Sequence, residues 1–268
     1  MNISSLFTTA MVRRGELWRL VTCILPHADI LHLGFNIYWF WIFGTVVERV
    51  YGHLKTAALI VLLAVGSSSL EFAFAQGGVG LSGVVYGLFG LLWVLSPRDE
   101  RFEGSVDHRT VQLFVVWFFF CIVTTLVHIF PVANIAHGAG AVLGILVGFA
   151  IVLPDRRKVA AMGAAAIILC FGLWAATLGR PRLNLSGNAG YEEGMWGYDA
   201  LEAGSNKEAV RWLRDAVLYQ PKDDIYWYDL GIAYERVGDK KAAQAAYQSA
   251  HRLKPDNTEY SEALEGVK

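Results

Sequence analysis

The sequence is poor in cysteine and in charge, and both shortages limit what the protein can be. It contains three cysteines in 268 residues, at Cys23, Cys121 and Cys170. Their odd number and wide spacing argue against a disulfide framework or a cysteine zinc cluster, so we expect small buried apolar side chains there. The net charge of −1 gives no basic surplus, so no nucleic-acid partner is implied.

Charge is unevenly distributed along the chain. Residues 1–179 contain 11 Lys+Arg and 9 Asp+Glu, whereas the shorter part from 180 to 268 contains 12 and 15. The first part is therefore composed like a membrane domain, and the second like a soluble one.

Long apolar runs occupy most of the first part. Each is close to the ~20 residues that a helix needs to cross the hydrocarbon core of a bilayer. The runs do not alternate between apolar and polar residues, which argues against membrane strands. The sequence therefore predicts an all-α, polytopic transmembrane bundle with spans at 31–50, 55–75, 80–97, 111–130, 133–153 and 159–178.

Basic residues predict the orientation of these spans. The loops after the first, third and fifth spans carry Lys or Arg and should be cytoplasmic, whereas the loops at 76–78 and 130–132 carry no charge and should be external. The segment that follows the sixth span should then also be external. Arg13, Arg14 and Arg19 conflict with this scheme, because they fall on the external side.

A 34-residue period marks the tail. We expect a linker at 180–189 and two helical repeats at 190–268, the length and pattern of the tetratricopeptide (TPR) family. The second copy carries the marker residues Trp227, Leu230, Gly231, Tyr234, Ala243, Tyr247, Ala250 and Pro255. Two repeats are fewer than the three or so that are usually stable alone, so we expect contact with the membrane domain or with a protein partner.

Three segments carry chemistry: Gly80-Leu81-Ser82-Gly83, Ala136-His137-Gly138-Ala139-Gly140, and the series His27, His32, Asn36. Ser82 and His137 should lie at similar depth in the outer half of the bilayer. Glycines four residues apart, at 83 and 87 and at 140, 144 and 148, predict that these two helices pack closely.

A buried serine hydroxyl needs a base, and a neutral imidazole within hydrogen-bond reach supplies one. We therefore expect Ser82 as nucleophile and His137 as base. His32 and Asn36 share one helical face and can stabilise an oxyanion together with the backbone N–H of Ser82. We prefer a Ser–His dyad to a triad, with Glu71 as the alternative carboxylate partner. A zinc site of His27, His32 and His137 is the rival interpretation.

In this order, the motifs resemble those of the rhomboid intramembrane serine proteases, over roughly residues 15–153. The resemblance implies cleavage of transmembrane proteins in the bilayer without a cofactor, and a location in a bacterial inner membrane with the tail on the periplasmic side. It further implies that Tyr86 packs on the imidazole, that Trp18 and Arg19 brace the first external loop, and that Glu48 anchors the inner end of its helix. Gly80, Gly83 and Gly140 would support the site.

The sequence departs from the family at one point. In the family a first helix precedes the Trp-Arg loop. Leu6 to Val12 is too short to span, so we expect either a misplaced start codon or a truncated core. The domain prediction is thus a rhomboid-like core at 1–158, an added membrane helix at 159–179, the linker and the repeats. A catalytically silent client-binding protein and a transporter are the alternative functions, the latter without the inverted repeats that would support it.

Overall fold

A computed structural model describes the chain apart from residues 1–8, 76, 131, 187–189 and 268. Among the described residues the regular structure is helical and contains no strand, so the all-α prediction is confirmed. Contacts divide the chain into two units, Met1–Asn184 and Leu185–Lys268.

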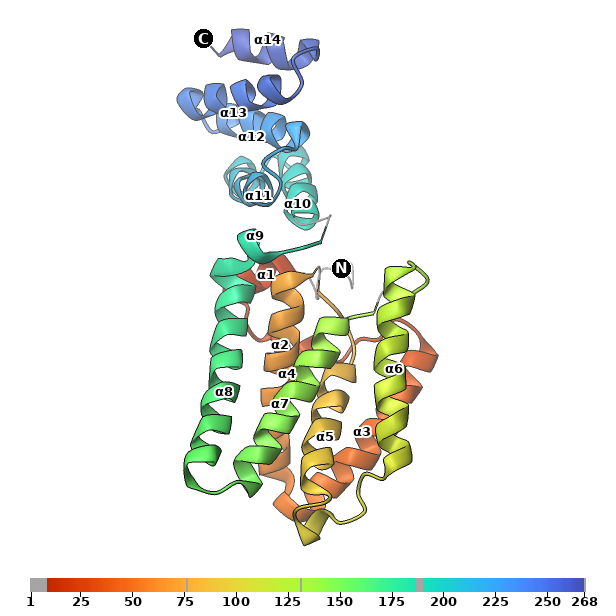
Figure 1. Cartoon of the computed structure of the whole chain (residues 1–268). Helices are drawn as coiled ribbons and strands as arrows, with labels where there is room; N and C mark the ends of the chain where they lie inside the picture. The colour runs from red at the N-terminus through yellow and green to blue at the C-terminus, as the bar shows by residue number, and fades with distance from the viewer. Residues whose placement is uncertain (1–8, 76, 131, 187–189, 268) are drawn as a thin grey trace. The chain divides into compact units, whose positions relative to one another are not determined.

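The first unit is a bundle of apolar helices (Figure 1). Its α-helices are α1 (Thr9–Arg13), α2 (Arg19–Thr22), α3 (Ile30–Tyr51), α4 (His53–Phe74), α5 (Ser82–Leu95), α6 (His108–Leu126), α7 (Asn134–Val152), α8 (Asp155–Trp174) and α9 (Arg180–Leu183). A 3-10 turn, η2 (Glu100–Phe102), precedes α6, and a π-helical turn, η3 (Ala175–Gly179), joins α8 to α9.

Five of the described helices are long and apolar enough to cross a membrane, counting Asp155–Leu183 as one. The third predicted span is shorter than expected, because its helix α5 has 14 residues. At 1.5 Å per residue it is about 21 Å long, against about 30 Å for the hydrocarbon core. One end of α5 therefore lies within the depth of the bilayer, which suits a site that begins at Ser82.

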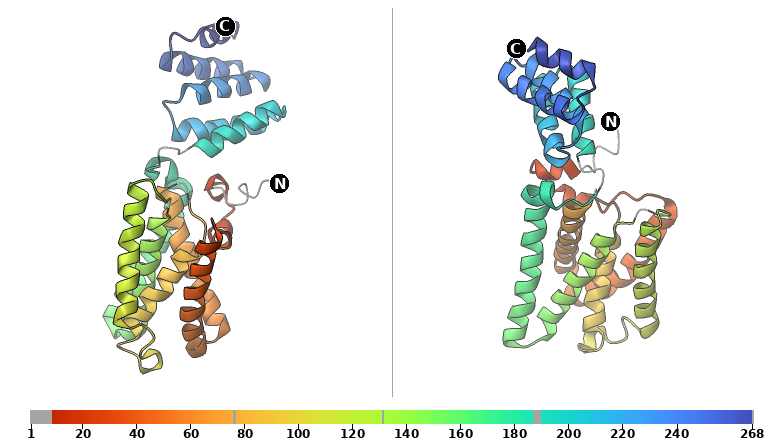
Figure 2. Two further views of the ribbon diagram at one scale, coloured as in Figure 1. Left: turned by 90° about the vertical axis from the view of Figure 1, so that its right-hand side faces the viewer. Right: turned by 45° about the horizontal axis from the view of Figure 1, so that its top comes forward.

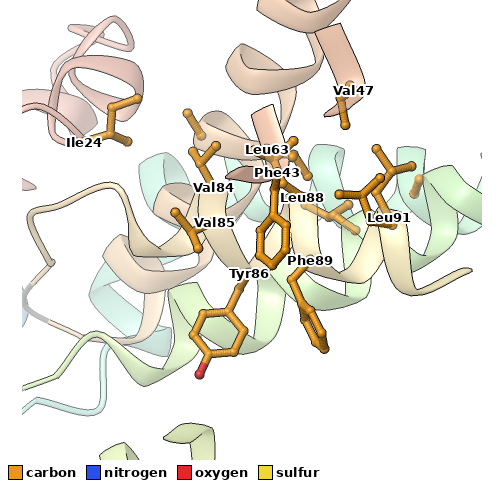
Figure 3. Close-up of a cluster of buried hydrophobic side chains, with 14 of the residues drawn as sticks. Ile24, Phe43, Val47, Leu63, Val84, Val85, Tyr86, Leu88, Phe89 and Leu91 are labelled. Carbon is orange, nitrogen blue, oxygen red and sulfur yellow. The ribbon is translucent and has the colours of Figure 1, made fainter. Parts of the chain in front are cut away.

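Helix α5 forms the centre of the bundle, and twelve of its residues are buried. On one side, Phe43 of α3 lies beside Phe89, with ring centroids 6.3 Å apart, and Leu63 of α4 packs into the same cluster (Figure 3). On the other side α7 approaches closely, since a Cβ on Gly140 would collide with the carbonyl oxygen of Gly83. The predicted glycine contact between these helices is confirmed.

The N-terminal segment neutralises one of the basic residues that conflicted with the orientation. Arg19 is buried, and its guanidinium lies 2.7 Å from a carboxylate oxygen of Glu16 and 4.5 Å from the ring of Trp18. Arg19 is thus paired rather than a free positive charge in the loop that the sequence predicts to be external. The apolar stretch 6–12 lies partly outside the described residues.

The linker predicted at 180–189 is wrong at its start. Residues 180–183 form α9 and belong to the first unit, where Arg180 is buried. Pro181 follows the π-helical turn η3, and the helix runs on through it from Asp155 to Leu183. Positions 187–189 of the linker lie outside the described residues.

The second unit consists of helix pairs (Figure 2). They are α10 (Tyr191–Glu202) with α11 (Asn206–Tyr219), and α12 (Asp224–Arg236) with α13 (Lys240–Leu253), followed by α14 (Thr258–Gly266). Within each pair a glycine admits a large side chain: Gly197 faces Leu213, and Gly231 faces Tyr247. This is the packing expected for helical repeats.

Candidate active site

Ser82 and His137 meet between two helices. Ser82 is the first residue of α5, and His137 lies in the first turn of α7. Nε2 of His137 lies 2.7 Å from Oγ of Ser82, within hydrogen-bond distance. The glycine contacts between α5 and α7 bring the two side chains together, because bulkier residues would hold the backbones apart.

The imidazole of His137 is enclosed. Its side chain is only 3% exposed, and its ring stacks on that of Tyr86 with centroids 4.7 Å apart. The Tyr86 hydroxyl donates a hydrogen bond of 3.2 Å to the carbonyl oxygen of Phe114, which fixes the stacking ring. Nδ1 of His137 has no hydrogen-bond partner among the described residues, so no carboxylate in that part of the chain orients the ring.

Glu71 does not bind the imidazole. Its Oε2 accepts a 2.9 Å hydrogen bond from the backbone N–H of Ala136, the residue before His137. The carboxylate thus satisfies one of the free N–H groups at the start of α7 and complements the positive end of its dipole. The sequence predicted Glu71 only as an alternative partner of the imidazole and not in this role.

His32 and Asn36 gather around Gly80. A Cβ at Gly80 would lie 2.7 Å from Cε1 of His32 and 3.5 Å from Nδ2 of Asn36. Gly80 also has φ of +115°, a conformation that other residues rarely adopt. Asn36 is 2% exposed, and its Nδ2 has no partner in the described part of the chain. A buried amide donor is therefore available near Gly80, two residues before Ser82.

His27 lies against the segment that leads to Ser82. The backbone N–H of Leu81 donates to its Nε2 at 3.4 Å, and Nδ1 lies 3.0 Å from the carbonyl oxygen of Leu25. Gly80 is held similarly, because its N–H donates to the carbonyl oxygen of Cys23. The rival zinc site finds no support, since no three His, Cys, Asp or Glu residues within the described ranges are placed to hold a metal ion.

A small cavity adjoins Ser82. Its volume is about 10 Å³, roughly the room that one water molecule needs. Ser67, Ser68 and Glu71 of α4 line it together with Gly80 and Ser82. Ser82 therefore adjoins a space that suits a water molecule.

The remaining predicted residues lie around this centre or far from it. Gly83 lies against Ser67, and Gly140 lies against Gly83, so both occupy positions without room for a side chain. A carboxylate oxygen of Glu48 lies against Nδ1 of His53 at the opposite end of the bundle. Its position fits the predicted role at the inner end of its helix and not a role in catalysis.

Each unit of the chain contains a segment that matches a known protein family. Residues 14–154 match the Rhomboid domain family, and residues 225–257 match the Tetratricopeptide repeat family. The second match covers α12 and α13, so a first repeat at α10 and α11 stays a prediction.

Curated relatives include the rhomboid protease GlpG of Salmonella paratyphi A, of Salmonella newport and of Salmonella typhi. Each is 31% identical over 150 residues, which are 55% of this chain and 53% of the relative. The chain spans about half the length of the curated relatives it matches.

Proposed function

This chain belongs to the rhomboid family, and on that basis we propose that it is an intramembrane serine endopeptidase acting through a dyad of Ser82 and His137. The observation that carries the proposal is the 2.7 Å distance between Ser82 Oγ and His137 Nε2 in a buried setting. A serine hydroxyl becomes a competent nucleophile when a neutral imidazole accepts its proton.

His137 accepts or donates a proton in each step of the proposed reaction. Nε2 takes the proton of Ser82 as Oγ attacks the scissile carbonyl carbon, and the imidazolium gives it to the departing amine. The resulting acyl-enzyme is hydrolysed when His137 deprotonates a water, for which the cavity beside Ser82 has room. Tyr86 stacks on the imidazole ring of His137 and so keeps its orientation fixed throughout the reaction.

The oxyanion that forms during attack needs hydrogen-bond donors. The backbone N–H of Ser82 has no acceptor within α5, because the first N–H groups of a helix lack one. Asn36 Nδ2 adds a buried side-chain donor, and His32 lies beside it against Gly80. Donors fixed before the reaction stabilise a developing charge without reorganising.

The substrates proposed are membrane proteins cleaved in or near a transmembrane helix. A helix hides its carbonyl groups in hydrogen bonds, so the scissile segment must unwind before Ser82 reaches it. Small, helix-weakening residues near the outer surface are therefore the expected cleavage region.

The tail is proposed to lie on the external side and to bind a protein. Helical repeats present surfaces for protein partners, and the second unit exposes aromatic residues such as Tyr191 and Tyr198. A bacterial inner membrane with the tail in the periplasm is the proposed location.

Cleavage in liposomes tests the proposal. The parent, Ser82→Ala and His137→Ala would be reconstituted with a single-helix substrate that carries Gly and Ala residues near its outer end. The control is Ser96→Ala, which removes a serine at the opposite end of α5, where Oγ lies 3.4 Å from the carbonyl oxygen of Val106. We expect cleavage by the parent and the control, and none by the two dyad variants.

Cleavage that survives Ser82→Ala would contradict the assignment. A well-folded parent that cleaves no such substrate and reacts with no serine-directed inhibitor would favour the catalytically silent, client-binding alternative.

A further inference from the structure

The last apolar helix packs closely on the helix that supports the active site. From Asp155 to Leu183 it forms one apolar helix, and in Figure 1 α8 runs along the bundle next to α7 and α4. The rings of Phe171 and Phe74 lie 6.3 Å apart, and a Cβ on Gly172 would collide with Oγ of Ser69. Helix α8 is therefore a packed member of the bundle.

The outer end of this helix caps α4. Arg180 is 2% exposed, and its Nη1 donates to the carbonyl oxygen of Phe72 at 2.5 Å. Asn184 Nδ2 donates to the carbonyl oxygen of Ala75 at 2.8 Å. The last carbonyls of a helix lack intrahelical donors and form the negative end of its dipole, so a buried cation and an amide stabilise this end of α4.

The same end of α4 organises both halves of the dyad. Glu71 precedes Phe72 and binds the N–H of Ala136, next to His137. After Ala75 the chain continues to Gly80 and Ser82. A shift of this end of α4 would therefore move the base and the nucleophile relative to each other.

We propose that Arg180 and Asn184 are positioning residues for the Ser82–His137 dyad, which makes the helix leading to the tail part of the catalytic unit. The inference rests on the proposed protease function. Neither residue touches substrate, because both act through the outer end of α4.

Steady-state cleavage of the single-helix substrate in liposomes tests this inference. Arg180→Met replaces the cation with an apolar side chain of similar length. We expect kcat to fall about tenfold with KM within about twofold, because misalignment slows the chemical step and leaves binding intact. Arg180→Lys should stay within about threefold of the parent, since it keeps the charge near the helix end.

Arg182→Met is the matched control, because it removes the same charge from an exposed position of α9. It should behave as the parent does. Reaction with a fluorophosphonate separates positioning from loss of fold: the positioning role predicts a slower rate and an undiminished final labelled fraction. A merely structural role predicts a smaller labelled fraction.

Parent-like kcat in Arg180→Met, an equal loss in Arg182→Met, or failure of Arg180→Lys to restore kcat would each overturn the inference. If Arg180→Met does not fold, Asn184→Ala tests the inference in its place. We expect its kcat to fall about threefold, and an unchanged kcat would overturn the inference. An inactive, unlabelled parent would instead refute the proposed protease.

Discussion

Two buried nitrogens at the site lack partners within the described residues, Nδ1 of His137 and Nδ2 of Asn36. Such a group costs roughly 1–3 kcal/mol of stability relative to a satisfied one, and most buried polar groups in proteins are paired. Nδ1 is the nitrogen of the His137 ring that does not meet Ser82, and Nδ2 of Asn36 lies near Gly80. The placement of the Asn36 amide fits a donor whose partner arrives with the substrate and its developing charge.

Asn36→Ala tests the oxyanion role at this scale. Removing one such donor typically costs about 100-fold or more in kcat, because the donor acts on charge that develops only in the transition state. We expect that loss with KM changed by less than about threefold, measured by steady-state cleavage in liposomes.

Thr45→Ala is the control, a half-buried polar residue farther along α3. It should retain the parent kcat. If Asn36→Ala also kept the parent kcat, or if its loss lay in KM, the amide would not stabilise the oxyanion.

Sequence reasoning singled out Ser82, His137 and Asn36 from their order and their depth along helices, and Tyr86 from the resemblance to the rhomboid family. It left Glu71 as an alternative partner of His137 and placed Arg180 in a linker. Both residues bridge helices far apart in the chain, α4 to α7 and α9 to α4. Only the packed bundle reveals such contacts, since sequence spacing gives no neighbour across helices.

At the scale of elements, the pairing of α5 with α7 determines the site. A Cβ at Gly144 would collide with the carbonyl oxygen of Gly87, as one at Gly140 would with that of Gly83. These contacts hold backbone against backbone. Small residues allow such close approach in lipid, where the hydrophobic effect does not drive helices together.

Gly144→Ala should therefore force α5 and α7 apart. Overpacking of this kind costs about 1–3 kcal/mol, and the separation should also lengthen the distance between Ser82 and His137. We expect a lower thermal midpoint in detergent and reduced cleavage, both measured on the same preparation.

Gly163→Ala is the matched control, because a Cβ there would meet nothing within 4 Å. In a helix this change is neutral or stabilising by up to about 1 kcal/mol. Equal midpoints for the parent and Gly144→Ala would mean that the glycine contact does not set the helix spacing.

At the scale of the whole molecule, the two units differ in what stabilises them. The first buries apolar side chains around α5, whereas the second carries many charges on short amphipathic helices. The negative charge of Asp229 destabilises the folded second unit. Burial, and then the nearby Asp223 carboxylate, raise the pKa of Asp229 to about 6.

This shift gives a pH dependence with a defined sign. The folded-state pKa of Asp229 exceeds the ordinary value of 3.8, so the folded unit binds the proton more tightly than the unfolded chain does. Its ionisation therefore destabilises the fold as pH rises from about 4 to above 6. Asp229→Asn should stabilise the second unit at pH 7 by about 1–2 kcal/mol.

Hydrogen exchange of the α12 and α13 amides in the intact chain measures the effect. The variant should exchange more slowly than the parent at pH 7, and the difference should shrink towards pH 4. Equal exchange at pH 7 would mean that the Asp229 carboxylate is not destabilising.

The central claim is that His137 activates Ser82. The most direct measurement treats the detergent-purified chain with a fluorophosphonate and maps the adduct by mass spectrometry, in the parent and in His137→Ala. The account predicts one adduct, on Ser82, formed at least about 100-fold more slowly without the imidazole. An adduct on another serine, or equal rates in the two proteins, would contradict it.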